Sequence, residues 1–313
     1  MFDPFAPGAV AWPYDQYDAL RAMVVRRVDA VLDGLASRGA MDAIGEFAYP
    51  FPVTVINEML GLPDEDADRA RAWIAAVARL MDPVVDPDEA AGDATLMAEM
   101  YDHVAARTAD KRRRPGPDVL TALVEATEGG DRLTTDELVA QVATLFVAGH
   151  EPSMALTGMG LLALIRHPDQ LARLRANPSL VPGAVQELAR YDGPNQFLRR
   201  IARRPMALGG RSISPGDVLY AGVAAANRDP ARWGPGAGEL RIDRPDAAQH
   251  VQFGGGTHHC LGHHLGRLQV EVALGAAVAR LDDLALAGEP VWNNRMVLRS
   301  LRHLPVTYTA GGR

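Results

Sequence analysis

The stretch FGGGTHHCLGHHLGR, residues 253–267, is the most informative part of this sequence because it holds the only cysteine of the 313-residue chain, Cys260. Three consecutive glycines precede the thiol, and four histidines lie close to it. Such a glycine run costs backbone entropy and is expected where another group approaches the chain closely. A helical apolar pattern begins directly after the cysteine, and backbone N–H groups at a helix start stabilise a thiolate. The stretch therefore predicts a thiol in an open loop before a helix.

Three interpretations of Cys260 follow from the residues alone. A buried, inert thiol is the commonest fate of a single cysteine, but it does not explain the glycines. A zinc site with the neighbouring histidines lacks a second pair of ligands elsewhere in the chain, and the adjacent His263 and His264 point in different directions on a helix. A thiolate ligand of haem iron, under a flat macrocycle stacked on the glycine loop, accounts for all of these features.

A longer pattern, F-G-x-G-x-H-x-C-x-G, is matched by Phe253, Gly254, Gly256, His258, Cys260 and Gly262. On these positions the stretch resembles the haem-binding signature of the cytochrome P450 family. The resemblance implies a mainly α fold with a small β part and a haem b cofactor (iron protoporphyrin IX). It implies Cys260 as the proximal ligand of the iron, and it implies that His258 reaches a haem propionate.

Two further segments resemble the family in the same order along the chain. In ELAR, Glu187 and Arg190 share a helix face at i and i+3 and can pair, and the family completes this pair with a later arginine, here Arg244. The resemblance implies that the trio is structural and ties its helix to the segment before the cysteine loop. In the strand that follows, it implies that Arg200, or alternatively Arg199, meets a haem propionate.

The beginning of the chain departs from the family. The resemblance runs from about Asp18 to the last residue, and it includes FAYPFPVTVINEMLGLP and AANRDPARW. We expect a single haem-thiolate domain over residues 1–313 that is shortened at its N-terminal side, with residues 1–17 as a poorly matching remnant. Part of the substrate roof and one basic clamp for a propionate would then be absent.

The stretch AGHEPS, which begins at Ala148, differs from the family pattern Ala/Gly-Gly-x-Asp/Glu-Thr at one position. Gly149 and Glu151 match, but Pro152 replaces the threonine that helps deliver protons in the family. Proline has no N–H, so the carbonyl of Ala148 loses its partner and the helix is expected to kink. Ser153 could return a hydroxyl to the carbonyl of Gly149 or to a water. We therefore expect Ala148, Gly149, Glu151 and Ser153 to form the catalytic oxygen and proton-delivery site, with a kink that serves only packing as the alternative.

Helical periodicity dominates the rest of the chain. Apolar stripes and helix signals predict five helices, over residues 14–39, 64–81, 94–114, 134–167 and 178–192. The fourth opens with Thr134 three residues before Glu137, which is a capping-box pattern. Gly-Gly and Pro-Gly turns then separate short β-prone runs in residues 206–227, and the tail over residues 296–310 is β-prone as well.

The composition excludes several classes of protein. The net charge is −7, from 32 basic and 39 acidic residues, and no long basic run is present, so we expect no nucleic-acid partner. A single cysteine rules out an internal disulfide. No uninterrupted apolar stretch reaches membrane-spanning length, and the start of the sequence does not resemble a signal peptide. We expect a cytoplasmic monomer that does not contact a membrane.

Together these features predict a haem-thiolate monooxygenase that inserts one oxygen atom from O2 into a small apolar or amphipathic molecule. The electrons would come from a separate ferredoxin and its reductase, because the sequence contains no flavin or nicotinamide motif. His263, His264 and Arg267 could dock that acidic partner or could be ordinary solvated surface. Further residues could line a substrate pocket or simply pack the core: Leu145, Phe146, Met154, Phe197, Leu198, Met296 and Val297.

Two alternatives to this function stay open. A relative without the usual threonine could be a degenerate, non-catalytic haem binder or a module that recruits other proteins. The altered AGHEPS stretch is also compatible with oxidation driven by peroxide, or with an isomerisation that needs no activation of oxygen.

Overall fold

The computed structural model describes residues 14–64, 67–127 and 133–311. Its α-helices are α1 (Tyr14–Leu35), α2 (Pro50–Leu60), α3 (Ala67–Leu80), α4 (Pro87–Arg113), α5 (Val119–Thr127), α6 (Thr135–Arg166), α7 (Pro168–Ala176), α8 (Val181–Asp192), α9 (Val223–Ala226), α10 (Pro230–Trp233) and α11 (His263–Arg280). A π-helix spans Ala43–Ala48, and short 3-10 turns span Pro178–Leu180, Ala247–Gln249 and Gly256–His258. The strands are β1 (Ala40–Asp42), β2 (Phe197–Ile201), β3 (Met206–Leu208), β4 (Arg211–Ile213), β5 (Val218–Gly222), β6 (Leu281–Leu286), β7 (Val291–Trp292), β8 (Leu301–His303) and β9 (Pro305–Ala310).

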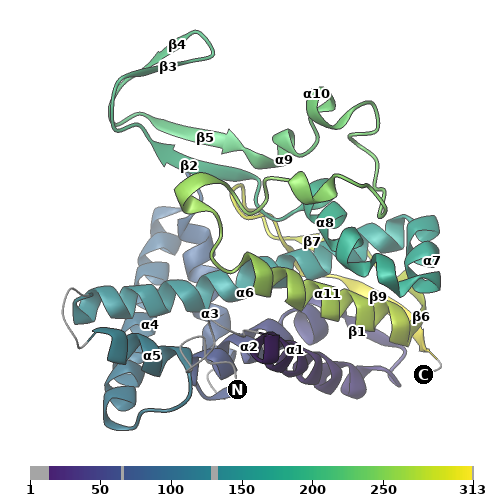
Figure 1. The fold of residues 1–313 in the computed structure, drawn as a ribbon, viewed down its shortest axis with the longest axis horizontal. Helices are drawn as coiled ribbons and strands as arrows, with labels where there is room; N and C mark the ends of the chain where they lie inside the picture. The colour runs from purple at the N-terminus through teal and green to yellow at the C-terminus, as the bar shows by residue number, and fades with distance from the viewer. Residues whose placement is uncertain (1–13, 65–66, 128–132, 312–313) are drawn as a thin grey trace.

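The long helix α6 is the centre of the fold (Figure 1). It begins with the capping box expected from the sequence: the Thr134 hydroxyl accepts the Glu137 N–H at 3.2 Å, and the Glu137 carboxylate accepts the Thr134 N–H at 2.7 Å. Helices α2, α4, α8 and α11 pack around it, and almost every residue from His150 to Leu164 is buried. The position of α6 therefore fixes the elements that carry the site.

One small sheet joins the segment after α1 to the last strands of the described chain. Its strand order is β1–β9–β6, and β1 pairs antiparallel with β9, with Met41 opposite Val306. Asp42 strengthens this junction, because its carboxylate accepts the Leu304 N–H at 2.9 Å and lies 2.7 Å from the His303 ring. The sheet ties the region that follows α1 to the end of the chain.

Strands β2 and β5 form an antiparallel pair, and the β3–β4 hairpin extends from it (Figure 1). In this view the hairpin is the part of the molecule farthest from α1. The arm formed by β2, β5 and the β3–β4 hairpin, residues 197–222, exposes several large apolar side chains: Ile201, Met206, Leu208, Val218 and Tyr220. The base of the arm adjoins the cysteine loop, because a side chain at Gly254 would lie 3.7 Å from Leu198.

The expected secondary structure is largely present. The predicted helices correspond to α1, α3, α4, α6 and α8, although α4 starts earlier than expected, at Pro87, where Asp86 caps it. The β-prone runs form β3, β4, β5, β8 and β9, so the fold is mainly α with a small β part. Periodicity did not find α2, the π-helix or the pairing of β1 with β9. Residues 1–13 of the poorly matching remnant lie outside the described residues. Within the described part, no helix is both long and apolar enough to cross a membrane.

Candidate active site

The cysteine loop has a defined backbone although its surface is open. The Cys260 N–H donates to the carbonyl of Phe253 at 2.9 Å, which closes the loop. Gly254 and Gly256 have φ values of +71° and +65°, in the left-handed region that other residues rarely adopt. These two glycines are therefore required by the backbone, whatever else they do.

The Cys260 thiol lies at the entrance to α11. The helix begins at His263 with Gly262 as its N-cap residue, and the Gly262 N–H hydrogen-bonds to the thiol. Partial burial of the sulfur raises the pKa of Cys260, whereas the hydrogen bond from Gly262 opposes this shift. A cation bound to the sulfur would complete the stabilisation of the thiolate that the helix start begins.

The loop faces open space. A Cβ atom added at Gly255, Gly256 or Gly262 would meet no other atom within 4 Å, and residues 255–262 are all exposed. A flat macrocycle can therefore lie against this loop with its iron on Cys260, without a clash at the glycines. The residues present fit a haem.

The histidines around Cys260 do not form a zinc site. The rings of His259 and His263 pack edge to face with centroids 4.7 Å apart, and those of His263 and His264 are 3.9 Å apart. Across the described residues, no group of three or more His, Cys, Asp or Glu side chains could hold a metal ion. The donor geometry therefore favours one thiolate ligand over a histidine cluster.

The stretch AGHEPS lies inside α6 and divides between two faces of it. Ala148 is exposed on the same face as Thr144, whereas Gly149 faces α2, where a Cβ atom would lie 2.4 Å from Ile56. Gly149 is therefore explained by close packing. Pro152 is part of one helix that runs without interruption from Thr135 to Arg166, so the missing N–H does not end the helix.

Ser153 was expected to give its hydroxyl to the carbonyl of Gly149 or to a water. Within the described part of the chain its hydroxyl makes no hydrogen bond to the carbonyl of Gly149, and the contact with a water stays a prediction. A Cβ atom at Gly266 would lie 3.8 Å from the Ser153 hydroxyl oxygen, so the side chain faces α11. Each residue turns the helix by about 100°, so Ser153 lies on a different face of α6 from the partly exposed Pro152 that precedes it.

Glu151 is buried and faces the β7–β8 hairpin. Its carboxylate oxygen lies 3.6 Å from Nη1 of Arg295, and the Ser300 hydroxyl favours the charged form of the same carboxylate. Burial raises the pKa of Glu151, and the Arg295 cation and the Ser300 hydroxyl oppose that shift. Sequence reasoning missed both partners, because an arginine in a loop near the C-terminal end carries no pattern that links it to α6.

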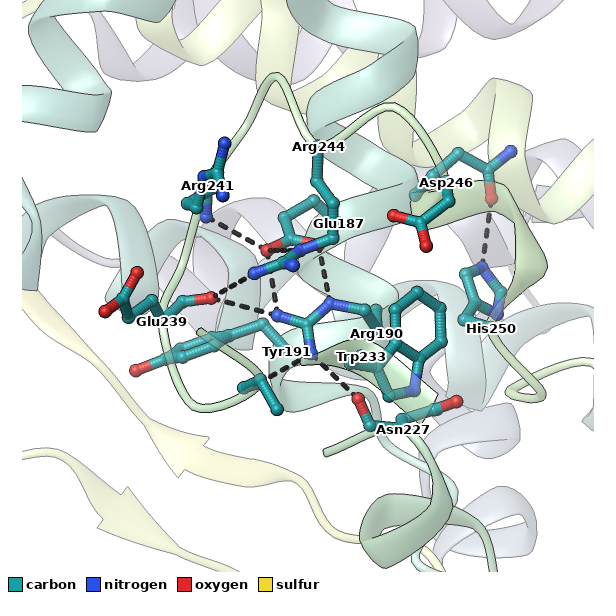
Figure 2. Close-up of polar contacts among 12 residues, drawn as sticks. Glu187, Arg190, Tyr191, Asn227, Trp233, Glu239, Arg241, Arg244, Asp246 and His250 are labelled. Atoms are coloured by element: carbon teal, nitrogen blue, oxygen red, sulfur yellow. Dashed lines mark hydrogen bonds and ion pairs between the residues drawn. The ribbon is translucent and has the colours of Figure 1, made fainter. Parts of the chain in front are cut away.

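The structure brings Glu187, Arg190 and Arg244 together in the core (Figure 2). Arg190 donates to both oxygens of Glu187 at 2.7 and 2.9 Å, and Arg244 Nε lies 3.1 Å from each of them. The Arg190 guanidinium also donates to the carbonyls of Asn227, Ala237 and Glu239 at 2.8 to 2.9 Å. The trio therefore joins α8 to the segment that leads into the cysteine loop.

The remaining predicted residues lie in different environments. Arg200 and His258 are exposed, and Arg200 donates to the carbonyl of Arg199 at 2.8 Å, so neither is held in a fixed recognition geometry by carboxylates. Phe146 and Met154 are core residues, with 3% and 5% of their surface exposed. By contrast Met296 is 46% exposed beside a cavity of about 380 Å³.

The comparisons with known proteins agree with this geometry. A sequence model of the family described as Cytochrome P450 matches residues 87–294. The chain is 39% identical over 301 residues to the cytochrome P450 monooxygenase PikC of Streptomyces venezuelae, covering 94% of this chain and 70% of that one. It is 38% identical over 293 residues to the vitamin D(3) 25-hydroxylase of Pseudonocardia autotrophica, covering 92% and 70%. It superposes with a TM-score of 0.89, at 29% identity, on P450BioI bound to an acyl carrier protein that carries hexadec-9Z-enoic acid, covering 97% and 76%.

The fold and the cysteine loop thus define a haem-thiolate enzyme. The chain belongs to the cytochrome P450 family of monooxygenases, whose members bind haem b through a cysteine thiolate. It spans about 70% of the length of the two relatives above.

Proposed function

We propose that this protein is a monooxygenase that inserts one oxygen atom from O2 into a small apolar or amphipathic molecule, with electrons from a ferredoxin and its reductase. The observation that carries the proposal is the Cys260 thiol, which accepts the Gly262 N–H in an exposed, glycine-lined loop at a helix start. A haem thiolate donates electron density to the iron and favours cleavage of the O–O bond.

The residues that would hold the haem come from two parts of the chain. Cys260 would bind the iron, and Phe253, Gly254, Gly256 and Gly262 shape the loop against which the ring lies. His258 and Arg200 are exposed and unpaired with carboxylates in the described structure, so their positive or polar ends are available to propionates.

Glu151 is the residue of α6 best suited to hold and release a proton. It is buried and its pKa is raised, so its two protonation states lie closer in energy near neutral pH than those of a surface glutamate. Ala148 is exposed, and its carbonyl has no N–H donor at Pro152. Water can therefore bind to that carbonyl, on the same helix as Glu151. In this proposal the Ser153 hydroxyl donates to that water.

Two comparisons support an apolar or amphipathic substrate. One relative is named for hydroxylation of vitamin D(3), and one structural neighbour is bound to a carrier protein loaded with a long-chain fatty acid. Met296 and Trp292 form the apolar part of a cavity whose other lining residues are polar: Asn293, Asn294, Arg295 and Arg299. We also propose that the protein acts as a monomer in the cytoplasm.

The proposal is tested by turnover of haem-loaded protein with a surrogate ferredoxin and reductase, on a substrate found by spectral-shift screening. We expect product that depends on the electron donor and on O2, and none from Cys260→Ser. Product formed with hydrogen peroxide alone, at the same rate and without the donor proteins, would instead support the peroxide-driven alternative. Haem binding without any product in either assay would support the degenerate relative.

A further inference from the structure

The β7–β8 hairpin meets α6 at Glu151, and none of the motifs of the sequence predicts this contact. Arg295 projects from the hairpin to within 3.6 Å of the Glu151 carboxylate, and only about 10% of its side chain is exposed. Ser300 is fully buried and accepts the amide N–H of Asn293 at 2.9 Å, and its hydroxyl favours the charged form of the same carboxylate. Glu151 is thus held by one cation and one hydroxyl, both from the same hairpin.

The hairpin itself is fixed from two other sides. Asp82, which follows α3, accepts the backbone N–H groups of Met296 at 3.1 Å and Val297 at 2.8 Å. At the start of β2, the Gln196 N–H donates to the carbonyl of Val297 at 3.0 Å, and the Arg299 N–H donates to that of Pro194 at 2.8 Å. Arg295 therefore reaches Glu151 from a backbone that does not depend on the ion pair for its position.

The ion pair between Arg295 and Glu151 leaves one buried nitrogen of Arg295 without a hydrogen-bond partner, unlike the structural ion pairs of Glu187. Nη1 of Arg295 is buried and has no hydrogen-bond partner in the described part of the chain, because 3.6 Å is too long for a hydrogen bond. Arg295 also faces Arg79, whose positive charge repels its own. Asp82 and Asp93 lie nearby, and their negative charges stabilise the charged form of Arg295. The contrast is the Glu187 carboxylate, which both Arg190 and Arg244 approach within 3.1 Å.

We propose that Arg295 and Ser300 are positioning residues for Glu151: they hold its carboxylate at α6 and set how readily it takes up and releases a proton. This inference rests on the proposed role of Glu151 in proton delivery. Removing the cation leaves a buried carboxylate with a single hydroxyl partner, which favours the neutral acid. Removing the hydroxyl has the same direction and a smaller effect, because the charge remains.

The first test measures the ionisation of Glu151 without any turnover. Infrared spectra of the full chain across pH 4 to 9 should contain a carbonyl band of a buried carboxylic acid, identified by its loss in Glu151→Gln. In Arg295→Gln this band should persist to a pH higher by about one unit or more. Ser300→Ala should shift it less, and Arg295→Lys should restore a value near that of the parent. Arg302→Gln is the matched control, because Arg302 is exposed on the same hairpin.

The second test is a double-mutant cycle in chemical unfolding, which separates a positioning role from simple packing. At pH 8, Arg295→Gln should raise the equilibrium constant for unfolding about 30-fold, because it strands a buried charge. At pH 5 the increase should be smaller, since the raised pKa of Glu151 makes a larger share of this carboxyl neutral there. In a Glu151→Gln background, Arg295→Gln should have little effect at either pH. If Arg295→Gln costs the same at both pH values and in both backgrounds, and the infrared band does not move, Arg295 only packs the hairpin and the inference is overturned.

These readouts separate the inference from the proposed function. Coupling between Arg295 and Glu151, together with unchanged product yield in Glu151→Gln, would support the positioning role and contradict the proton-delivery role. No coupling, together with lost product yield in Glu151→Gln, would overturn the positioning role and leave proton delivery standing.

Discussion

The cysteine loop and the Glu187 trio are joined by one stretch of backbone, yet their polar groups are satisfied in opposite ways. In the trio the side chains of Glu187 and Arg190 are completely buried, and every hydrogen bond is made within the chain. In the loop, residues 255–262 are exposed, and a Cβ atom added at Gly255, Gly256 or Gly262 would meet no other atom within 4 Å. The trio is complete as it stands, whereas the loop is built for a group that the chain does not supply. Substitutions in the two regions should therefore affect different properties: stability in the trio, and binding in the loop.

The largest expected effect is loss of stability in the trio. Glu187→Gln or Arg190→Ala leaves a buried charge without its partner, so the free energy of unfolding should fall by about 3 to 5 kcal/mol. That is a large part of a typical stability of about 5 to 15 kcal/mol. Urea unfolding monitored by circular dichroism measures it, with or without haem.

A matched control for the trio is available on the surface. Arg173 pairs with Asp243, and their side chains are 46% and 42% exposed. Arg173→Ala should cost no more than about 1 kcal/mol. Equal costs for Arg173→Ala and Arg190→Ala would contradict the view that burial makes the trio important.

The second largest effect is the pH dependence of stability caused by His250, which lies near the trio. Burial, together with the nearby Arg267 cation, lowers the pKa of His250 to about 4, from an unfolded value near 6.5. Since the unfolded state takes up the proton first as the pH falls, stability should decrease between about pH 6.5 and 4. The loss from His250 should be at most about 2 kcal/mol at pH 5.

Unfolding curves of the parent and of His250→Gln at pH 7.5 and 5 measure this loss. The variant should lose less stability on acidification than the parent. His150, which is fully buried and has a pKa lowered to about 4 for the same reason, should account for part of the remaining slope. Identical slopes in parent and variant would show that His250 does not titrate in this range.

A smaller effect on stability is expected in the loop. Gly256→Ala places a Cβ atom at φ +65°, which should cost about 1 to 2 kcal/mol, even though the side chain would meet nothing. Gly255 has an extended backbone with φ −171° and is equally open, so Gly255→Ala should cost close to nothing. Both variants should bind haem less tightly if the ring lies on the loop, and haem titration by absorbance measures that. Unchanged haem affinity in both would contradict a ring stacked on these glycines.

The ion pair of the trio and the backbone of the loop could be predicted from the sequence for different physical reasons, whereas their roles stay predictions. The E-x-x-R spacing places Glu187 and Arg190 on one helix face, and local geometry alone brings them together. The loop could be predicted because the backbone has positive φ values at Gly254 and Gly256, which favour glycine. In both cases the information lies within a few consecutive residues.

Contacts between distant segments were not predictable in this way. Arg295 reaches Glu151 across 144 positions of the sequence, and no helix or strand periodicity relates them. The pairing of β1 with β9 is equally remote, and β1 has only three residues to signal it. The packing of Ser153 has a related cause: its side chain is buried against α11, and the pattern of the local helix does not indicate that contact.

The measurement that tests the account most directly is the absorbance spectrum of reduced, haem-loaded protein with carbon monoxide, compared between the parent and Cys260→Ser. The parent should show the red-shifted Soret band of thiolate ligation, and Cys260→Ser should lack it while its free energy of unfolding without haem stays within about 0.5 kcal/mol of the parent. A histidine-type spectrum in the parent, unchanged by Cys260→Ser, would contradict the assignment of Cys260 and point to the neighbouring histidines as ligands.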